Sequence, residues 1–84
     1  MFYVYILYSA QYDKTYTGYS QDPEQRLLSH NELSPKGWTK RYRPWKLIYT
    51  QSYPTKAEAL QQEKFLKTGK GREYIRLELL NKLQ

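Results

Sequence analysis

The run Phe2-Tyr-Val-Tyr-Ile-Leu-Tyr-Ser9 decides the fold of this 84-residue chain. All of its residues except the last are aromatic, β-branched or leucine, a composition typical of a β-strand. Apolar side chains point to both faces of this strand, so we expect it at the centre of a sheet. Because successive side chains alternate, Tyr3 and Tyr5 share one face and Val4 lies on the other.

Turn and cap signals place the next two elements. The polar residues 10–14 predict a turn, after which Thr15 to Tyr19 returns as a second strand of a hairpin. Asp22 followed by a proline predicts a helix start, with the aspartate as N-cap. This helix is expected to end near Asn31.

The second half of the chain predicts a loop, a strand and two helices. Thr55 with Glu58 forms a capping box that opens the first of these helices, and Gly69 is its expected C′ stop. The expected ranges are a long loop at 32–44, a third strand at 45–51, a helix at 55–68 and an amphipathic helix at 73–83.

The element order β-β-α-β-α-α predicts a fold of the α/β (α+β) class. We expect a three-stranded, mainly antiparallel sheet flanked by helices, with residues 1–84 forming a single domain. The absence of cysteine excludes disulfides, cysteine zinc sites and thiol catalysis. No stretch has the apolar length of a membrane span, and the start lacks a signal-peptide pattern, so we expect a soluble cytoplasmic protein.

Positive charge is concentrated in one stretch of the sequence. The net charge is +6, and residues 33–57 contain six cations and no acid. A localised positive field favours a polyanionic partner, although a solvated basic loop is the alternative. Two tryptophans in this stretch could stack on bases or only anchor the loop. The candidate nucleic-acid-binding residues are Lys36, Trp38, Lys40, Arg41, Arg43 and Lys46.

Glu63 occupies a position that packing would give to an apolar residue. At 100° per residue it falls on the same arc of its helix as Ala59 and Leu66. A carboxylate on a buried face needs an ion pair or a metal ion. An ion pair with Arg26 or a lysine, or a stem bent towards the helix edge, is the alternative to a metal site.

Further candidates lie on the first helix and the second strand. Arg26 and His30 are four residues apart and share a helix face, which suits a phosphate. A lone histidine is nevertheless often structural. Tyr16 and Gly18 end the second strand, where the glycine allows a close approach to the backbone or simply marks the strand end.

Together these residues resemble the GIY-YIG nuclease family. The segments Tyr3-Val4-Tyr5 and Tyr16-Thr17-Gly18, followed by Arg26, His30 and Glu63, correspond to its motifs. The short stand-alone bacterial members, which are similar to the N-terminal cleavage domain of UvrC, are the nearest match. The first triplet lacks its leading glycine, valine and threonine replace the two isoleucines, and Asn81 is a weak candidate for a further family position.

The resemblance implies metal-dependent endonuclease activity on DNA, with RNA left open and no protein partner indicated. Glu63 would hold Mg²⁺ (or Mn²⁺), Arg26 would neutralise the phosphate, and Tyr5 would be the general base. Tyr16 would position the water or share that role, His30 could take up a proton, and Gly18 would admit the substrate. The alternatives are a non-catalytic nucleic-acid-binding module that uses residues 36–46 and a protein-interaction domain.

Overall fold

The computed structural model describes residues 1–33 and 38–80 of the chain. Three strands form one antiparallel sheet: β1 (Phe2–Ser9), β2 (Lys14–Ser20) and β3 (Lys46–Tyr53), in the order β2-β1-β3. The central position predicted for the first strand is confirmed. Its residues 4–7 are fully buried because a helical layer covers each face of the sheet.

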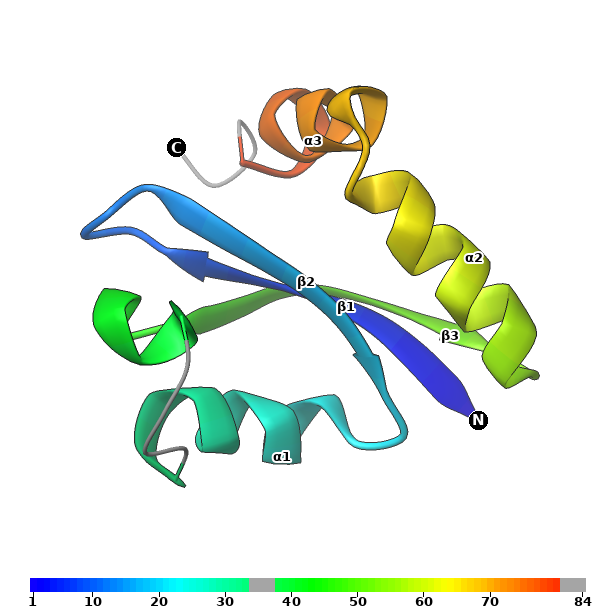
Figure 1. Ribbon diagram of the computed structural model, residues 1–84, viewed down its shortest axis with the longest axis horizontal. Helices are drawn as coiled ribbons and strands as arrows, with labels where there is room; N and C mark the ends of the chain where they lie inside the picture. The colour runs from blue at the N-terminus through cyan, green and yellow to red at the C-terminus, as the bar shows by residue number, and fades with distance from the viewer. Residues whose placement is uncertain (34–37, 81–84) are drawn as a thin grey trace.

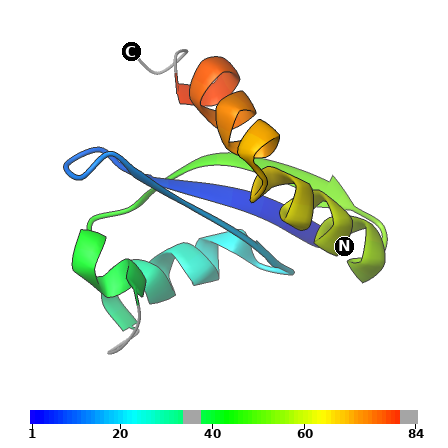
Figure 2. The same ribbon diagram turned by 45° about the horizontal axis from the view of Figure 1, so that its top comes forward.

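Helices cover the two faces unequally (Figure 1). On one side lies α1 (Pro23–Leu28), which continues into the π-turn η1 (Ser29–Leu33). On the other side lie α2 (Lys56–Leu66) and α3 (Gly69–Tyr74), and α3 continues into η3 (Ile75–Leu80). Figure 2 shows the same three layers from a second angle. No described helix is long and apolar enough to cross a membrane.

Each face of the sheet has its own apolar cluster. The face towards α2 and α3 holds the larger one, in which Val4 and Ile6 pack with Ala59, Leu66 and Ile75. The face towards α1 holds a smaller, more aromatic cluster of Tyr5, Leu7 and Trp45, with Leu27 and Tyr42 at its border. The alternation of side chains along β1 therefore separates an aliphatic core from an aromatic one.

Two of the predicted helix caps are present. The Asp22 carboxylate accepts a hydrogen bond from the Gln25 N–H at 3.1 Å, and the Thr55 hydroxyl accepts one from the Glu58 N–H at 3.3 Å. Each cap satisfies a backbone donor in the first turn, where the helix itself supplies no acceptor.

Three expected boundaries were wrong. Residues 38–42, placed in a long loop by sequence, form the 3₁₀-helix η2 (Trp38–Tyr42), and the helix expected to run to Asn31 becomes a π-turn after Leu28. Gly69 is not the stop of α2 but the first residue of α3, because Thr68 caps a new helix by accepting the Gly71 N–H at 3.2 Å. The last helical segment thus begins at Gly69 and not at Glu73.

The β1–β2 turn is fastened to η3. Both carboxylate oxygens of Asp13 accept hydrogen bonds from Nη1 of Arg76, at 3.0 and 3.1 Å, and one also accepts the Tyr8 hydroxyl at 2.9 Å. Asp13 has a φ of 52°, a left-handed conformation that aspartate tolerates better than most residues. The tip of the hairpin is thereby set beside the last helical segment.

The contact between α2 and α3 depends on a glycine. A Cβ at Gly71 would lie 2.5 Å from Leu66 Cα and closer still to the Phe65 carbonyl oxygen, whereas a Cβ at Gly69 would meet nothing within 4 Å. We expect Gly71→Ala to lower the free energy of unfolding by about 1–3 kcal/mol, because backbone atoms must move to make room. Urea unfolding measures this difference, with Gly69→Ala as the matched control that leaves stability unchanged or raised. Equal stability of the two variants would contradict the packing described.

Candidate active site

The hydroxyl of Tyr5 is the centre of a polar cluster on the α1 face. The Tyr5 side chain is fully buried, and its Oη lies 3.3 Å from Nε2 of His30. The guanidinium of Arg26 lies near enough to this hydroxyl to lower its pKa. The Tyr5 O–H can donate to Nε2 of His30 when the imidazole carries its proton on Nδ1.

Gly18 makes room for this hydroxyl. It is the cross-strand partner of Tyr5, and a Cβ at its position would lie 2.6 Å from Tyr5 Oη and 2.8 Å from Tyr5 Cζ. A side chain at residue 18 would therefore displace the phenol. Of the two readings of this glycine, close approach is the one that the structure supports, and the approaching group is a side chain of the cluster.

Tyr16 packs beside both members of the hydrogen bond. Its ring centroid is 4.6 Å from that of His30 and 6.3 Å from that of Tyr5. Tyr16 is half-buried, so it closes the cluster towards the outer edge of β2. The two tyrosines from neighbouring strands therefore meet at one imidazole.

His30 is oriented by contacts on the side of its ring that faces away from Tyr5. Its Nδ1 lies 3.0 Å from the hydroxyl of Thr39, a buried residue of η2. The backbone carbonyl of His30 accepts a hydrogen bond from Nε of Arg43. With Tyr5 donating to Nε2, Nδ1 carries the proton and donates to Thr39.

A second set of bonds fastens this segment to the start of β3. The Asn31 side chain accepts from the Trp45 N–H at 2.6 Å and donates to the Trp45 carbonyl at 2.9 Å. The indole N–H of Trp45 donates to the Thr39 carbonyl at 2.7 Å. Trp45 is buried, so of its two predicted roles the structure supports the loop anchor and not base stacking.

Burial sets the protonation states of the cluster. It raises the pKa of Tyr5 to about 12; the neighbouring Tyr16 adds to the rise, while the hydrogen bond and positive charge of Arg26 oppose it. Burial also lowers the pKa of His30, and the charges of Arg26 and Arg43 lower it further. At neutral pH the pair is therefore a neutral phenol beside a neutral imidazole.

Glu63 approaches the cluster from the opposite layer. It lies on α2, its side chain is only 14% exposed, and its carboxylate is 3.6 Å from the ammonium of Lys67. The negative charge of Glu63 contributes to the raised pKa of Tyr5, although it is the smallest of the causes. Among the described residues Glu63 makes no hydrogen bond to the cluster. The lysine pairing predicted as an alternative is present, with Lys67 and not with Arg26.

The predicted nucleic-acid-binding residues lie in varied surroundings. Lys40 and Arg41 of η2 and Lys46 of β3 are exposed, whereas Arg43 is half-buried and bonded to His30. The candidates Lys36 and Asn81 and the side chain of Trp38 lie outside the described residues.

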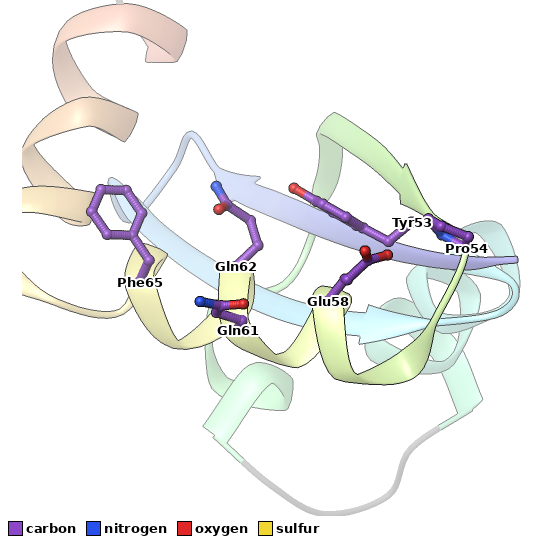
Figure 3. A pocket seen from close by; sticks show the side chains of 6 residues that line it. All are labelled: Tyr53, Pro54, Glu58, Gln61, Gln62 and Phe65. Carbon is purple, nitrogen blue, oxygen red and sulfur yellow. The ribbon is translucent and has the colours of Figure 1, made fainter.

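One sizeable cavity of the described structure lies away from the cluster. It is an open groove of about 530 Å³ between the end of β3 and the outer side of α2, lined by Tyr53, Gln61 and Phe65 among others (Figure 3). Its one charged lining residue is Glu58, which does not suit a polyanion. Cavity size does not identify the candidate active site here.

Thr39 and Asn31 are two residues that sequence reasoning missed. A threonine or an asparagine within a stretch expected as helix end and loop carries no signal of its own. Their importance comes from η2 and η1 folding back on each other, which brings Thr39 to the imidazole and Asn31 to Trp45.

Comparison with known proteins defines the class to which this sheet and cluster belong. A family model described as the GIY-YIG catalytic domain matches residues 1–75. The chain belongs to the GIY-YIG family and has its nuclease-type fold.

The relatives within this class are small bacterial proteins. The chain is 36% identical over 75 residues to a UPF0213 protein of Staphylococcus saprophyticus, covering 89% of this chain and 90% of the relative. It is 39% identical to a UPF0213 protein of Staphylococcus epidermidis over 69 residues, 82% of this chain and 78% of the relative. The solution NMR structure of a UPF0213 protein from Bacillus halodurans superposes with a TM-score of 0.52 at 31% identity, covering 89% and 82% of the two chains.

The environment of His30 predicts a pH effect on stability. The folded state favours the neutral imidazole. The contribution of His30 to the free energy of unfolding is therefore complete above the unfolded pKa of about 6.5, and it is lost as the pH falls below that value. His30→Gln should remove this part of the pH dependence. Urea unfolding between pH 5 and 8 measures it, and NMR titration of the single histidine gives its pKa directly. A pKa at or above the ordinary value would refute the buried, cation-flanked environment.

Proposed function

We propose that this chain is a divalent-metal-dependent endonuclease that hydrolyses phosphodiester bonds in DNA. The observation that carries the proposal is the hydrogen-bonded series Tyr5–His30–Thr39, with Gly18 leaving room for the phenol and the charge of Arg26 acting on it. Such an arrangement would set a proton acceptor near a cation able to bind a phosphate. We place the activity in the cytoplasm, where bacterial DNA lies.

Tyr5 would act as the general base through His30. A phenol with a pKa of about 12 is protonated at neutral pH, and removing its proton at pH 7 requires about 7 kcal/mol. A neutral imidazole 3.3 Å away offers another route. As water attacks phosphorus, its proton passes to Tyr5 Oη while the Tyr5 proton passes to His30 Nε2. Thr39 holds the ring in the tautomer that this transfer needs.

Arg26 would bind the scissile phosphate. It is exposed on α1, and its planar group can bridge the Tyr5 hydroxyl and a phosphate oxygen. Charge that develops on the phosphorane oxygens would then face a fixed cation. Tyr16, in contact with the imidazole, would position the attacking water or share the role of the base.

Glu63 would hold the metal ion, Mg²⁺ or Mn²⁺. The described residues contain no cluster of three or more acidic or histidine side chains, so a caged ion does not fit. A single, mostly buried carboxylate whose one partner among the described residues is a lysine 3.6 Å away does fit Mg²⁺, which keeps several waters and takes a phosphate oxygen. When bound, such an ion supplies positive charge for the leaving oxygen of the broken P–O bond.

The exposed cations of η2 and β3 would contact the DNA backbone without reading its sequence. The exposure of Lys40, Arg41 and Lys46 supports this role, and we assign Lys36 and Trp38 to it from the sequence pattern. About five such contacts give a log–log salt dependence with a slope near −5.

A nucleic-acid-binding module without catalysis is the second candidate. The observation in its favour is that Tyr5 has a raised pKa and that Glu63 is already paired with Lys67. Such a module would bind DNA without a metal and without need of Tyr5.

Nicking of supercoiled plasmid tests the proposed activity. We expect nicking with Mg²⁺ or Mn²⁺ and none with EDTA. Tyr5→Phe and Arg26→Ala should each reduce the rate by about 10²–10⁴, because each removes a group that acts in the transition state.

Glu63→Gln should abolish nicking at low metal concentration, because the amide has no charge for the ion. Glu58→Gln is the matched control, since Glu58 lies on the same helix but lines the groove of Figure 3. Equal loss of activity in both variants would remove Glu63 from the mechanism.

The pH profile of the rate separates proton relay from a free phenolate. With relay to His30 the rate should be flat near neutral pH and fall only below the ordinary histidine range, because burial and the nearby arginines lower the pKa of His30. In His30→Gln the phenolate must form unaided, so the residual rate should rise about tenfold per pH unit up to pH 10, because the pKa of Tyr5 is about 12. A wild-type rate that also rises steadily would show that His30 takes no proton.

A further inference from the structure

Cations from three separate segments line a groove along the outer edge of β2. One cavity of about 310 Å³ is lined by Lys14, Arg72 and Arg76, together with Asp13. A second, of about 170 Å³, is lined by Lys67 and again by Arg72. Both share Thr15 and Arg72, so we treat them as one feature, the β2-edge groove.

The groove has an excess of positive charge. Four cations and one acid, Asp13, line the groove. The Asp13 carboxylate is already paired with Arg76, which donates a hydrogen bond to each of its oxygens. Lys67 is paired with Glu63 over 3.6 Å, a weak contact with a half-exposed ammonium. Arg72 is exposed and its side chain has no partner among residues 1–33 and 38–80. The guanidinium at the middle of the groove is therefore available to a ligand.

Its floor supplies further hydrogen-bonding groups. In the described sheet β2 pairs only with β1, so its outer edge carries backbone N–H and C=O groups that no strand occupies. The Thr15 hydroxyl adds a donor where the two cavities join. Cations above a row of neutral donors suit phosphate oxygens.

The groove connects the candidate active site with the basic residues of η2. At one end it is lined by Tyr16, whose ring packs on His30. At the other end the Lys14 ammonium lies 5.7 Å from the ring of Tyr42 in η2, the helix that carries Lys40 and Arg41. The hairpin tip lies between η2 and the α3–η3 segment in both views (Figure 1 and Figure 2).

We propose that the β2-edge groove is a second phosphate-binding site that holds the DNA backbone away from the scissile bond. DNA would cross the edge of β2 with η2 on one side and Arg72, Lys14 and Lys67 on the other. This proposal rests on the proposed function for the identity of the ligand, but the groove itself is defined by geometry and charge. It would supply sequence-independent affinity and position the strand at Tyr16.

Fluorescence anisotropy of a 20-base-pair DNA duplex in EDTA tests the groove without cleavage. Lys14→Ala/Arg72→Ala should weaken binding about tenfold or more at 0.1 M salt. It should also make the slope of log K against log salt shallower by about 2, one for each lost phosphate contact. Arg72→Lys should keep the wild-type slope because it keeps the charge. Arg76 is unsuitable for this test, because it also fastens the hairpin.

Lys64→Ala is the matched control, an exposed cation of α2 that lines neither cavity, and it should bind as the wild type does. A double variant with the wild-type slope, or a wild-type chain that does not bind the duplex, would overturn the proposal. Tighter binding of a duplex RNA of the same sequence would overturn the choice of DNA.

Plasmid nicking separates this proposal from the proposed function. Tyr5-dependent nicking together with an unchanged slope in the double variant would refute the groove alone. Salt-dependent binding that needs Lys14 and Arg72, without nicking in the presence of any metal, would refute the proposed nuclease activity. The proposal that the β2-edge groove binds the DNA backbone would then still stand.

Discussion

A phenol buried inside a protein needs a partner for its hydroxyl, and His30 is the partner of the Tyr5 hydroxyl, with the positive charge of Arg26 nearby. The rest of the α1 face is arranged around that requirement. Gly18 leaves the space that the hydroxyl occupies, and Thr39 fixes the imidazole from behind. The same bonds that satisfy a buried polar group also align a proton donor with an acceptor.

The two faces of the sheet differ in the kind of side chains that they bury. The aliphatic cluster under α2 and α3 contains the close contact at Gly71 and the larger share of the buried apolar side chains. The aromatic cluster under α1 is smaller, and polar groups reach into it from η1 and η2. Burial of phenol and imidazole on that face lowers their tendency to carry charge, so both groups are neutral near pH 7.

Charge shows how folding reorganises a sequence pattern. Outside residues 33–57 the sequence has as many acids as cations, so this part of the sequence does not predict a positively charged surface. The fold nevertheless gathers Lys14, Lys67, Arg72 and Arg76 at the edge of β2, whereas acids such as Glu58 lie on the outer side of α2. The basic surface is thus wider than the basic stretch.

The sequence by itself determined the order of the strands and helices, the central place of β1 and the N-caps at Asp22 and Thr55. It also determined the membership of the GIY-YIG family, because hydrophobic alternation, caps and motifs are local patterns. It did not determine that Thr68 would start a new helix at Gly69, since a glycine after a helix usually stops it. Only the tertiary structure decided that Thr39 holds His30, that Glu63 pairs with Lys67 and that Arg72 lines the same groove as Lys14. Contacts between distant segments depend on strand register and helix packing, and no periodicity within the chain encodes them.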